Sequence, residues 1–223
     1  MTADFSRPLT AQEAVLGELR RMIADGRLLP GGRIVQDLLS AELGVSRVPL
    51  REALKILEGE GLVHYAAHRG HVVAPLSLAD LLEVYRIREL LEPEAVTLAV
   101  PVLTEAALAL LVDAAHEVEE AASCGDVTRM TVANRLLHDT LIEACGLPRL
   151  VRTIRQLWDA TEVYRTVYYN DELNRERVLH EHRDLVEAAC ARDTEGLLAV
   201  LASHRANAIT ALRPVLSRVD ATG

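Results

Sequence analysis

Three histidines and an asparagine are spaced so that they could hold a metal ion. Asn134 and His138 lie four residues apart in "ANRLLHDTL", which puts both on one face of a helix. His182 and His204 each lie eleven residues from Asp193, the centre of the predicted turn "ARDTEG". Because residues equally distant from the turn of an antiparallel helical hairpin lie opposite each other, these two histidines can meet. Three imidazoles and one oxygen ligand would bind a divalent ion such as Zn²⁺, Ni²⁺ or Mn²⁺. The alternative is that three of the chain's eight histidines fall on helices without forming a site.

A second set of residues could contact nucleic acid. Gly44 makes a sharp turn, and Ser46 is a good N-cap for the helix that follows. Arg47, Arg51 and Lys55 are four residues apart and therefore share one face of that helix. Its N-terminal end can enter a major groove and present arginine to guanine edges or to phosphates. The alternative is an ordinary solvated face of charged side chains.

The distribution of charge fits a nucleic-acid contact confined to the first part of the chain. The formal net charge is -9. Residues 1–75 contain nine basic and nine acidic side chains, whereas residues 76–223 contain 15 and 24. A DNA-binding surface needs only a local group of cations against the phosphates. The acidic balance therefore argues against DNA contact by the second part of the chain but not by the first.

The first part of the chain predicts the order helix, helix, tight turn, helix and β-hairpin, which is that of a winged helix-turn-helix. Thr10 and Glu13 form a predicted capping box at the start of the first helix. The hairpin is expected to turn at His68, Arg69 and Gly70, so that Arg69 at its tip could reach an adjacent groove. The buried side of the third helix is predicted to consist of Leu50, Leu54, Ile56 and Leu57.

From Ser77 onward the hydrophobic pattern is helical throughout, which predicts an antiparallel bundle of about six helices. The chain is therefore predicted to be mainly α, with a small β-hairpin wing only in the winged helix-turn-helix. We place the first domain at residues 8–75 and the all-helical domain at residues 76–218. The predicted helices of the second domain are 78–99, 104–123, 126–144, 148–168, 171–191 and 194–217.

The stretch "LLSAELGVSRVPLREALKILEGEGLV", followed by "HRGHVV", carries a specific resemblance. It resembles the DNA-binding domain of the GntR family of bacterial transcription regulators, over roughly residues 10–75. Two positions depart from the family's pattern. Val48 stands where the family usually has threonine, and Asp37 stands where the fatty-acid-responsive members have a DNA-contacting arginine, so neither contact is expected here. The resemblance implies that the DNA-contacting residues are Ser46, Arg47, Arg51, Arg69 and Gly70.

The pattern NxxxH…H…H, together with "YRIRELLEPEAVTLA", resembles the FCD effector-binding domain of the FadR subfamily, over about residues 78–217. Asn134 stands where that family has aspartate, and a neutral amide oxygen is a weaker ligand than a carboxylate. Six helices rather than seven would suit the VanR-like branch of the subfamily. The resemblance implies that a small carboxylate effector sits against a divalent metal held by Asn134, His138, His182 and His204.

Arg88 falls where the family has an inward arginine, so the resemblance implies that it binds the carboxylate of the effector. Two alternatives stay open from the sequence. Arg88 could form a surface pair with Glu92, which lies one helical turn later, or Arg86 on the same helix could take its place.

Together these features predict a homodimeric transcription regulator, usually a repressor, that binds a palindromic double-stranded DNA operator. The effector would change its affinity for DNA, and the protein would be no enzyme. One alternative is a metal-dependent hydrolase with an accessory N-terminal part, because three histidines on a metal could activate water. Another is a helical scaffold protein without a ligand.

The sequence also indicates a compartment. No apolar run reaches the roughly eighteen residues of a membrane span, and the first residues lack the apolar stretch of a secretory signal. The three cysteines show no CxxC spacing. We therefore expect a cytoplasmic protein with no membrane partner, located at the nucleoid when it is bound to DNA.

Overall fold

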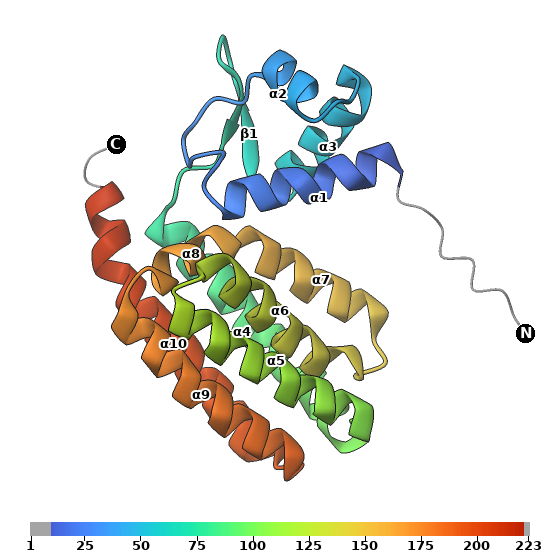
Figure 1. The fold of residues 1–223 in the computed structure, drawn as a ribbon, viewed down its shortest axis with the longest axis vertical. Coiled ribbons are helices and arrows are strands. Elements are labelled where there is room, and N and C mark those ends of the chain that lie inside the picture. The colour runs from blue at the N-terminus through green and yellow to red at the C-terminus, as the bar shows by residue number, and fades with distance from the viewer. Residues whose placement is uncertain (1–9, 221–223) are drawn as a thin grey trace, which may run out of the picture. The chain divides into compact units, whose positions relative to one another are not determined.

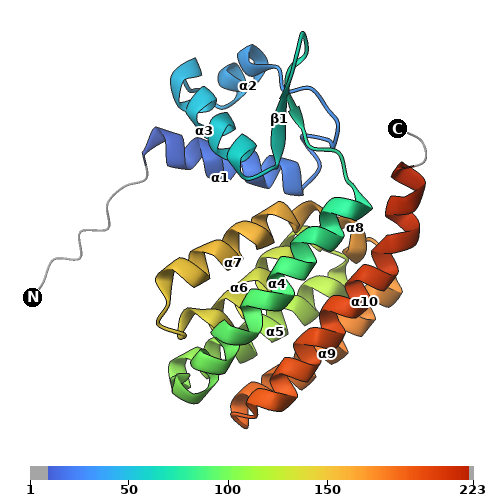
Figure 2. The same ribbon diagram turned by 180° about the vertical axis from the view of Figure 1, so that it is seen from behind.

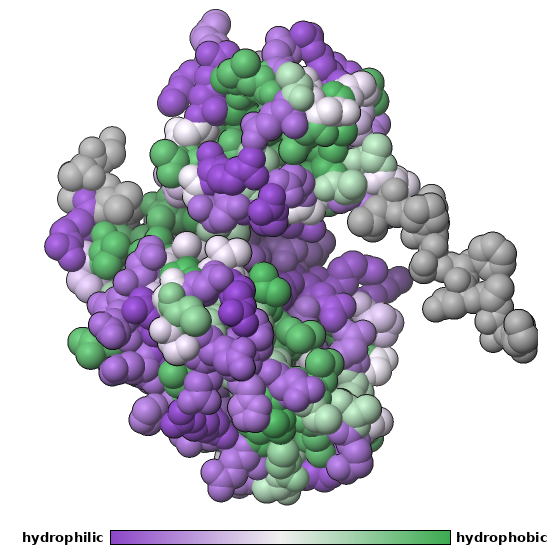
Figure 3. Space-filling view, viewed as in Figure 1, coloured by the Kyte–Doolittle hydropathy of each residue, from purple (hydrophilic) through white to green (hydrophobic). Residues whose placement is uncertain are grey.

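The structure is a computed structural model that describes residues 10–220, with side chains up to residue 218. It divides into two compact units, one ending at Pro75 and the other beginning at Leu76, and each is described by itself. Residues 8 and 9 of the predicted first domain lie outside the described residues. In Figure 3, hydrophilic side chains cover most of the visible face of each unit, and apolar side chains appear on it in small groups. No helix within residues 10–220 is long and apolar enough to span a membrane.

The first unit has the predicted winged helix-turn-helix order (Figure 1). The Thr10 hydroxyl accepts from the Glu13 backbone and the Glu13 carboxylate accepts from the Thr10 backbone, so the predicted capping box is present. The two strands pair antiparallel from Val63 opposite Val73 to the hairpin tip. The elements are α1 (Ala11–Ala24), α2 (Gln36–Glu42), α3 (Arg47–Gly59), β1 (Val63–Ala66) and β2 (Gly70–Val73).

The core of the first unit lies where α1 and α3 pack together and against the hairpin. One predicted core residue is wrong: Ile56 is only partly buried, and Ala53 takes its place beside Leu54. The reason is the helical period, because residues 50, 53, 54 and 57 form one stripe whereas residue 56 lies at its edge.

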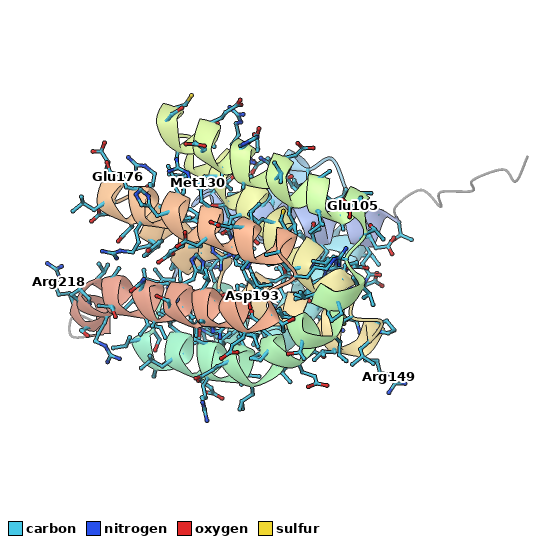
Figure 4. The ribbon with its side chains drawn as sticks, turned by 90° about the horizontal axis from the view of Figure 1, so that it is seen from below. Glu105, Met130, Arg149, Glu176, Asp193 and Arg218 are labelled. Atoms are coloured by element: carbon cyan, nitrogen blue, oxygen red, sulfur yellow. The ribbon has the colours of Figure 1, made fainter. Side chains whose placement is uncertain are left out.

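The second unit is a bundle of α-helices, as predicted. In Figures 1 and 2, α9 runs beside α10 and α4 lies on the other side of α10. Figure 4 shows the α9–α10 hairpin, with Asp193 at its turn and Glu176 and Arg218 at the far end. The elements are α4 (Leu78–Ala99), the short 3₁₀ helix η1 (Val100–Val102), α5 (Glu105–Cys124), α6 (Val127–Glu143), α7 (Pro148–Ala160), α8 (Glu162–Tyr169), α9 (Glu172–Cys190) and α10 (Thr194–Asp220).

The predicted helix 148–168 is two helices, α7 and α8, which meet at Thr161. The Thr161 hydroxyl donates to the backbone carbonyls of Leu157 and Trp158, which offers the chain a local alternative to continuing one helix. The described part of the bundle therefore has seven α-helices rather than six. The helix count on which the VanR-like resemblance rested does not support that branch.

Buried residues of the bundle fall into layers along its length. One apolar cluster includes Val96 of α4 and Leu141 of α6, and a second includes Tyr85 of α4 and Met130 of α6. Buried polar side chains lie between these clusters on the same helices. They are Arg88 and Glu92 on α4, Asn134 and His138 on α6, Glu181 and His182 on α9, and His204 and Arg205 on α10.

Candidate functional site

The three histidines singled out from the sequence come together in the polar layer of the bundle. His138 lies on α6, His182 on α9 and His204 on α10, and these residues are 6%, 1% and 8% exposed. Their ring centroids are 5.3 to 5.7 Å apart. One nitrogen from each ring can be chosen so that all three lie within 4.8 Å of one another. The equal spacing about Asp193 therefore does bring the α9 and α10 histidines to one level.

Unpaired polar atoms show whether these residues fit a metal ion. His138 Nε2 and both ring nitrogens of His182 are buried without a hydrogen-bond partner, as are both amide atoms of Asn134. Buried polar atoms rarely lack partners, and each such atom costs about 1–3 kcal/mol. Two nitrogens that each lie about 2.1 Å from one ion are at most about 4.2 Å apart, so small side-chain movements would complete the site. The residues present fit a divalent metal.

His204 is oriented by a carboxylate. Its Nδ1 lies 2.5 Å from Glu181 Oε2, and the other oxygen of Glu181 accepts from Asn207 Nδ2 at 2.6 Å. Burial raises the pKa of the Glu181 carboxyl, but the hydrogen bond and charge of His204, the hydrogen bond from Asn207 and the charge of Arg177 together outweigh it and hold the pKa below its ordinary value. With a carboxylate as acceptor, Nδ1 carries the proton, which leaves Nε2 of His204 free for an ion. Metal-binding histidines are commonly held this way.

The protonation of the other two histidines also suits metal binding. Burial, followed by the nearby His204 imidazole, holds the pKa of His138 and of His182 well below its ordinary value of 6.5. The guanidinium of Arg165 acts in the same direction on both. Both imidazoles are therefore neutral near pH 7, the form that can donate a lone pair to a metal.

Arg88 points into the bundle rather than to the surface. Its side chain is 2% exposed and its Nε donates to Glu92 Oε1 at 2.7 Å, whereas Arg86 is exposed and pairs with Glu89. The pair of Arg88 and Glu92 was foreseen as a surface alternative, but it is buried. Nη1 of Arg88 is buried without a partner. A cation next to the histidines therefore has an unused donor.

Glu92 is the centre of a buried network. Its Oε1 also accepts from Trp158 Nε1 at 2.7 Å, and its Oε2 accepts from Arg205 Nη1 at 2.7 Å. Burial raises the pKa of Glu92, but Arg88 and Arg205 outweigh it and hold the pKa below its ordinary value. Glu92 is therefore ionised, and one carboxylate serves two guanidinium groups.

Several of the site's polar residues were not identified from the sequence. Glu181, Arg205 and Arg165 are buried, and the Trp158 ring lies 4.5 Å from that of His138. The register about Asp193 could have indicated Glu181, since it lies twelve residues before the turn and so close to the level of His204. The others carry no periodic signal of their own. The Tyr164 hydroxyl bonds to the Ser77 carbonyl and the Asp80 carboxylate at the start of α4.

His182 also lines a cavity between α5 and α9. The cavity has a volume of about 340 Å³, within the usual range for small-molecule sites. Its wall is largely apolar, from Val112, Ala115, Leu179 and Val186, while His116, Glu119, Arg183 and Glu187 add polar groups. A small ligand could therefore approach the histidines from this side.

The candidate DNA-contacting residues are exposed in the first unit. Ser46 occupies the N-cap of α3 without a capping hydrogen bond, so its hydroxyl stays available. Arg47 and Arg51 follow on the outer face of α3, opposite its buried stripe. Arg69 is exposed at the hairpin tip, and Gly70 has φ 76, a conformation that favours glycine.

Asp37 interacts with the first of these arginines. Its Oδ1 lies 2.8 Å from an Nη of Arg47, and both side chains are about two-thirds exposed, at 65% and 68%. Such surface pairs contribute little, typically about 0–1 kcal/mol, so the guanidinium can exchange Asp37 for a phosphate or a base. Val48, which replaces the threonine of the pattern, is 54% exposed on the same turn of α3.

Two family profiles match the sequence. The profile described as bacterial regulatory proteins, gntR family, matches residues 11–73, and the profile described as FCD domain matches residues 83–207. The first covers the winged helix-turn-helix, and the second covers the helices that carry the histidines.

Similar proteins are named as regulators. The HTH-type transcriptional regulator YdhC of Bacillus subtilis is 30% identical over 188 residues, 84% of each chain. The HTH-type transcriptional regulator McbR of Escherichia coli is 32% identical over 186 residues, 82% of this chain and 83% of McbR. The solved structure of McbR matches with a TM-score of 0.84 and 28% identity, over 92% of this chain and 98% of that one.

Proposed function

Because the chain belongs to the GntR family of bacterial transcription regulators and carries an FCD domain, we propose that it is a repressor controlled by a small organic acid. Residues 8–75 would bind the operator, and residues 76–218 would bind the effector and form a homodimer. That the protein regulates transcription by binding DNA follows from its family and its relatives. Nothing among those relatives supports the hydrolase alternative. We place the regulator in the cytoplasm.

The observation that carries the proposal is the group of unpaired buried nitrogens. His138 and His182 are neutral, almost fully buried and without partners for three of their ring nitrogens. His204 is held by Glu181 with one nitrogen free, and Asn134 adds an amide oxygen. A divalent ion would satisfy these atoms and supply a positive centre for a carboxylate. The ion would be Zn²⁺, Ni²⁺ or Mn²⁺.

Arg88 would bind the effector carboxylate beside this centre, because its Nη1 has no other partner. The effector would then bridge α4 to the histidine-bearing helices α6, α9 and α10. A ligand that ties these helices together changes their relative stability. DNA affinity would change if the two states of the bundle place the DNA-binding units differently, which is a coupling free energy between two sites.

The proposed homodimer matches the proposed two-fold symmetry of the operator. One short recognition helix covers only a few base pairs, so a palindromic operator needs two copies. Apolar side chains on the surface of the helical unit would form the interface. On α4 these are Ile87, Leu90 and Leu98, which are 37%, 61% and 40% exposed.

The proposal is tested by a gel-shift titration on the DNA that flanks the protein's own gene. The full chain is added at fixed salt, because protein–DNA affinities depend steeply on salt. A panel of metabolite carboxylates is then titrated into the complex. We expect specific binding that at least one acid releases. Binding that no acid in a broad panel alters, in metal-loaded protein, would contradict effector control.

A further inference from the structure

The polar layer of the bundle holds more positive than negative buried charge. Arg88, Arg165 and Arg205 are each at most 7% exposed. Arg88 and Arg205 share the single carboxylate of Glu92. The other buried carboxylate, Glu181, is occupied by His204 and Asn207. Burying an unpaired charge is costly, so a bound anion would stabilise this excess of positive charge.

Of these three buried arginines, Arg165 has the fewest partners. It lies on α8 and its guanidinium carbon is 4.1 Å from the centroid of the Trp158 ring, while that of Arg88 is 4.0 Å from the same ring. Stacking on the indole accounts for part of its stabilisation. Within the described part of the chain, no carboxylate pairs with the Arg165 guanidinium. Its donors are therefore available to a ligand.

A pocket beside the histidines joins these groups. It is lined by residues from α4, α8 and α10, among them Arg88, Arg165 and His204. Its free space is about that of one water-sized group. The hydroxyl of Tyr168, which is 4% exposed, also lines it without a hydrogen-bond partner. The remaining lining residues are Tyr85, Tyr169, Arg205, Ala208 and Leu212.

We propose that this pocket is a second anion subsite and that the effector carries two acid groups. The inference rests on the proposed function and narrows its ligand class. The first carboxylate would bind at the histidines and Arg88. The second would pair with Arg165 and accept from the Tyr168 hydroxyl after these side chains move apart, because the pocket in this structure has room for about one water-sized group. A dianion would balance the two guanidinium charges that Glu92 leaves over, whereas a monoanion would leave Arg165 unpaired.

The test compares diacids with monoacids of the same carbon number on the metal-loaded full chain by calorimetry. The pairs are succinate and butyrate, glutarate and valerate, and adipate and hexanoate. We expect at least one diacid to bind about tenfold more tightly than its partner, a difference of about 1.4 kcal/mol. 3-Phosphonopropionate in place of succinate shows whether the second group is carboxylate-like or phosphate-like, and tight binding of either supports the subsite. No diacid preference in any pair would overturn it.

Variants show where the preference originates. Arg165→Gln should bring the ratio of diacid to monoacid binding affinity close to one, and it should change the monoacid affinity by no more than about twofold. Arg165→Lys should keep part of the preference for the diacid. Arg152→Gln, at an exposed arginine of α7, is the matched control. A preference that survives Arg165→Gln would mean that the diacid only chelates the metal. If Arg165→Gln does not fold, the ratio of diacid to monoacid affinity in the wild type and in Arg165→Lys still tests the second subsite.

The failure of this inference differs from that of the proposed function. A monoacid that changes operator affinity, with no diacid preference, overturns the second subsite alone. A diacid that binds through Arg165 while operator affinity stays constant overturns effector control and keeps the subsite.

Discussion

At the scale of single residues, His182 links metal binding to stability most directly. Its side chain is 1% exposed and neither ring nitrogen has a partner, so the metal-free site leaves two polar atoms uncompensated. An ion that binds only the folded chain would stabilise it by mass action. His180, exposed on the same helix, is the natural control for any change at this position.

Replacing Asn134 with aspartate should tighten metal binding, because a carboxylate adds negative charge beside a divalent ion. Without metal, Asn134→Asp should be less stable than the wild type, because it buries a carboxylate at a position that is 0% exposed. Competition with a fluorescent chelator gives the affinity, and thermal unfolding gives the stability. Asn170→Asp, at an exposed position, is the control. If neither wild type nor Asn134→Asp takes up Zn²⁺, Ni²⁺ or Mn²⁺, the site is a histidine-lined pocket only.

Stability of the metal-free protein should depend on pH through His138 and His182. Burial holds their pKa well below 6.5, so below that pH the unfolded chain binds protons that the folded chain does not. The free energy of unfolding should be level above about pH 7.5 and fall below pH 6.5, by up to about 1.4 kcal/mol per pH unit for each histidine.

Urea unfolding between about pH 8 and pH 5.5 measures this effect above the range where the carboxylates titrate. His182→Gln should show a shallower fall than the wild type, and His180→Ala should match the wild type. A wild-type unfolding midpoint that does not change across this range would contradict neutral buried histidines.

At the scale of elements, α3 carries Arg47 and Arg51, which we propose contact the operator. Arg47→Ala and Arg51→Ala should each weaken specific operator binding by about 1–3 kcal/mol, the usual contribution of a good base contact. Arg21→Ala removes an exposed arginine from α1 and should have little effect. Fluorescence anisotropy at fixed salt measures all three. Unchanged affinity in both α3 variants would remove α3 from the role of recognition helix.

Elements with local signals could be predicted from the sequence. The capping box at Thr10 and the turn at Asp193 are set by neighbouring residues, and the register of α9 against α10 follows from that turn by counting. The meeting of His182 with His204 could therefore be predicted. So could the hairpin turn, since Gly70 adopts the positive φ that glycine tolerates.

Features that depend on tertiary contacts could not be predicted. The break at Thr161 has no glycine or proline beside it, and its cause is a hydroxyl that bonds back to the preceding turn. Arg165 and Glu92 are charged residues in helical stretches, where a solvated position is the usual outcome. Only the packing of α8 and α4 around Trp158 buries them.

At the scale of the whole molecule, the two units differ in net charge. The first unit has no net charge and exposes arginines on α3 and at the hairpin tip. The whole formal net charge of -9 lies in the second unit. The repulsion between an acidic helical unit and phosphates would help to confine DNA contact to the first unit.

Two copies should bind one operator. Sedimentation of the full chain with a palindromic operator at micromolar concentration should give two protomers per DNA, because each recognition helix reads one half-site. A DNA with one half-site scrambled should bind far more weakly. A single protomer on the intact operator would contradict the homodimer.

The central claim, that the histidine site of the bundle controls DNA affinity, is tested most directly by a ratio of dissociation constants. Fluorescence anisotropy gives the Kd for the operator with and without saturating effector acid, for metal-loaded wild type, His182→Ala and His180→Ala. We predict a change of about tenfold or more in the wild type and His180→Ala, equivalent to a coupling free energy of about 1.4 kcal/mol. His182→Ala should still bind the operator but show a ratio near one. An equal ratio in His182→Ala and wild type would contradict the claim.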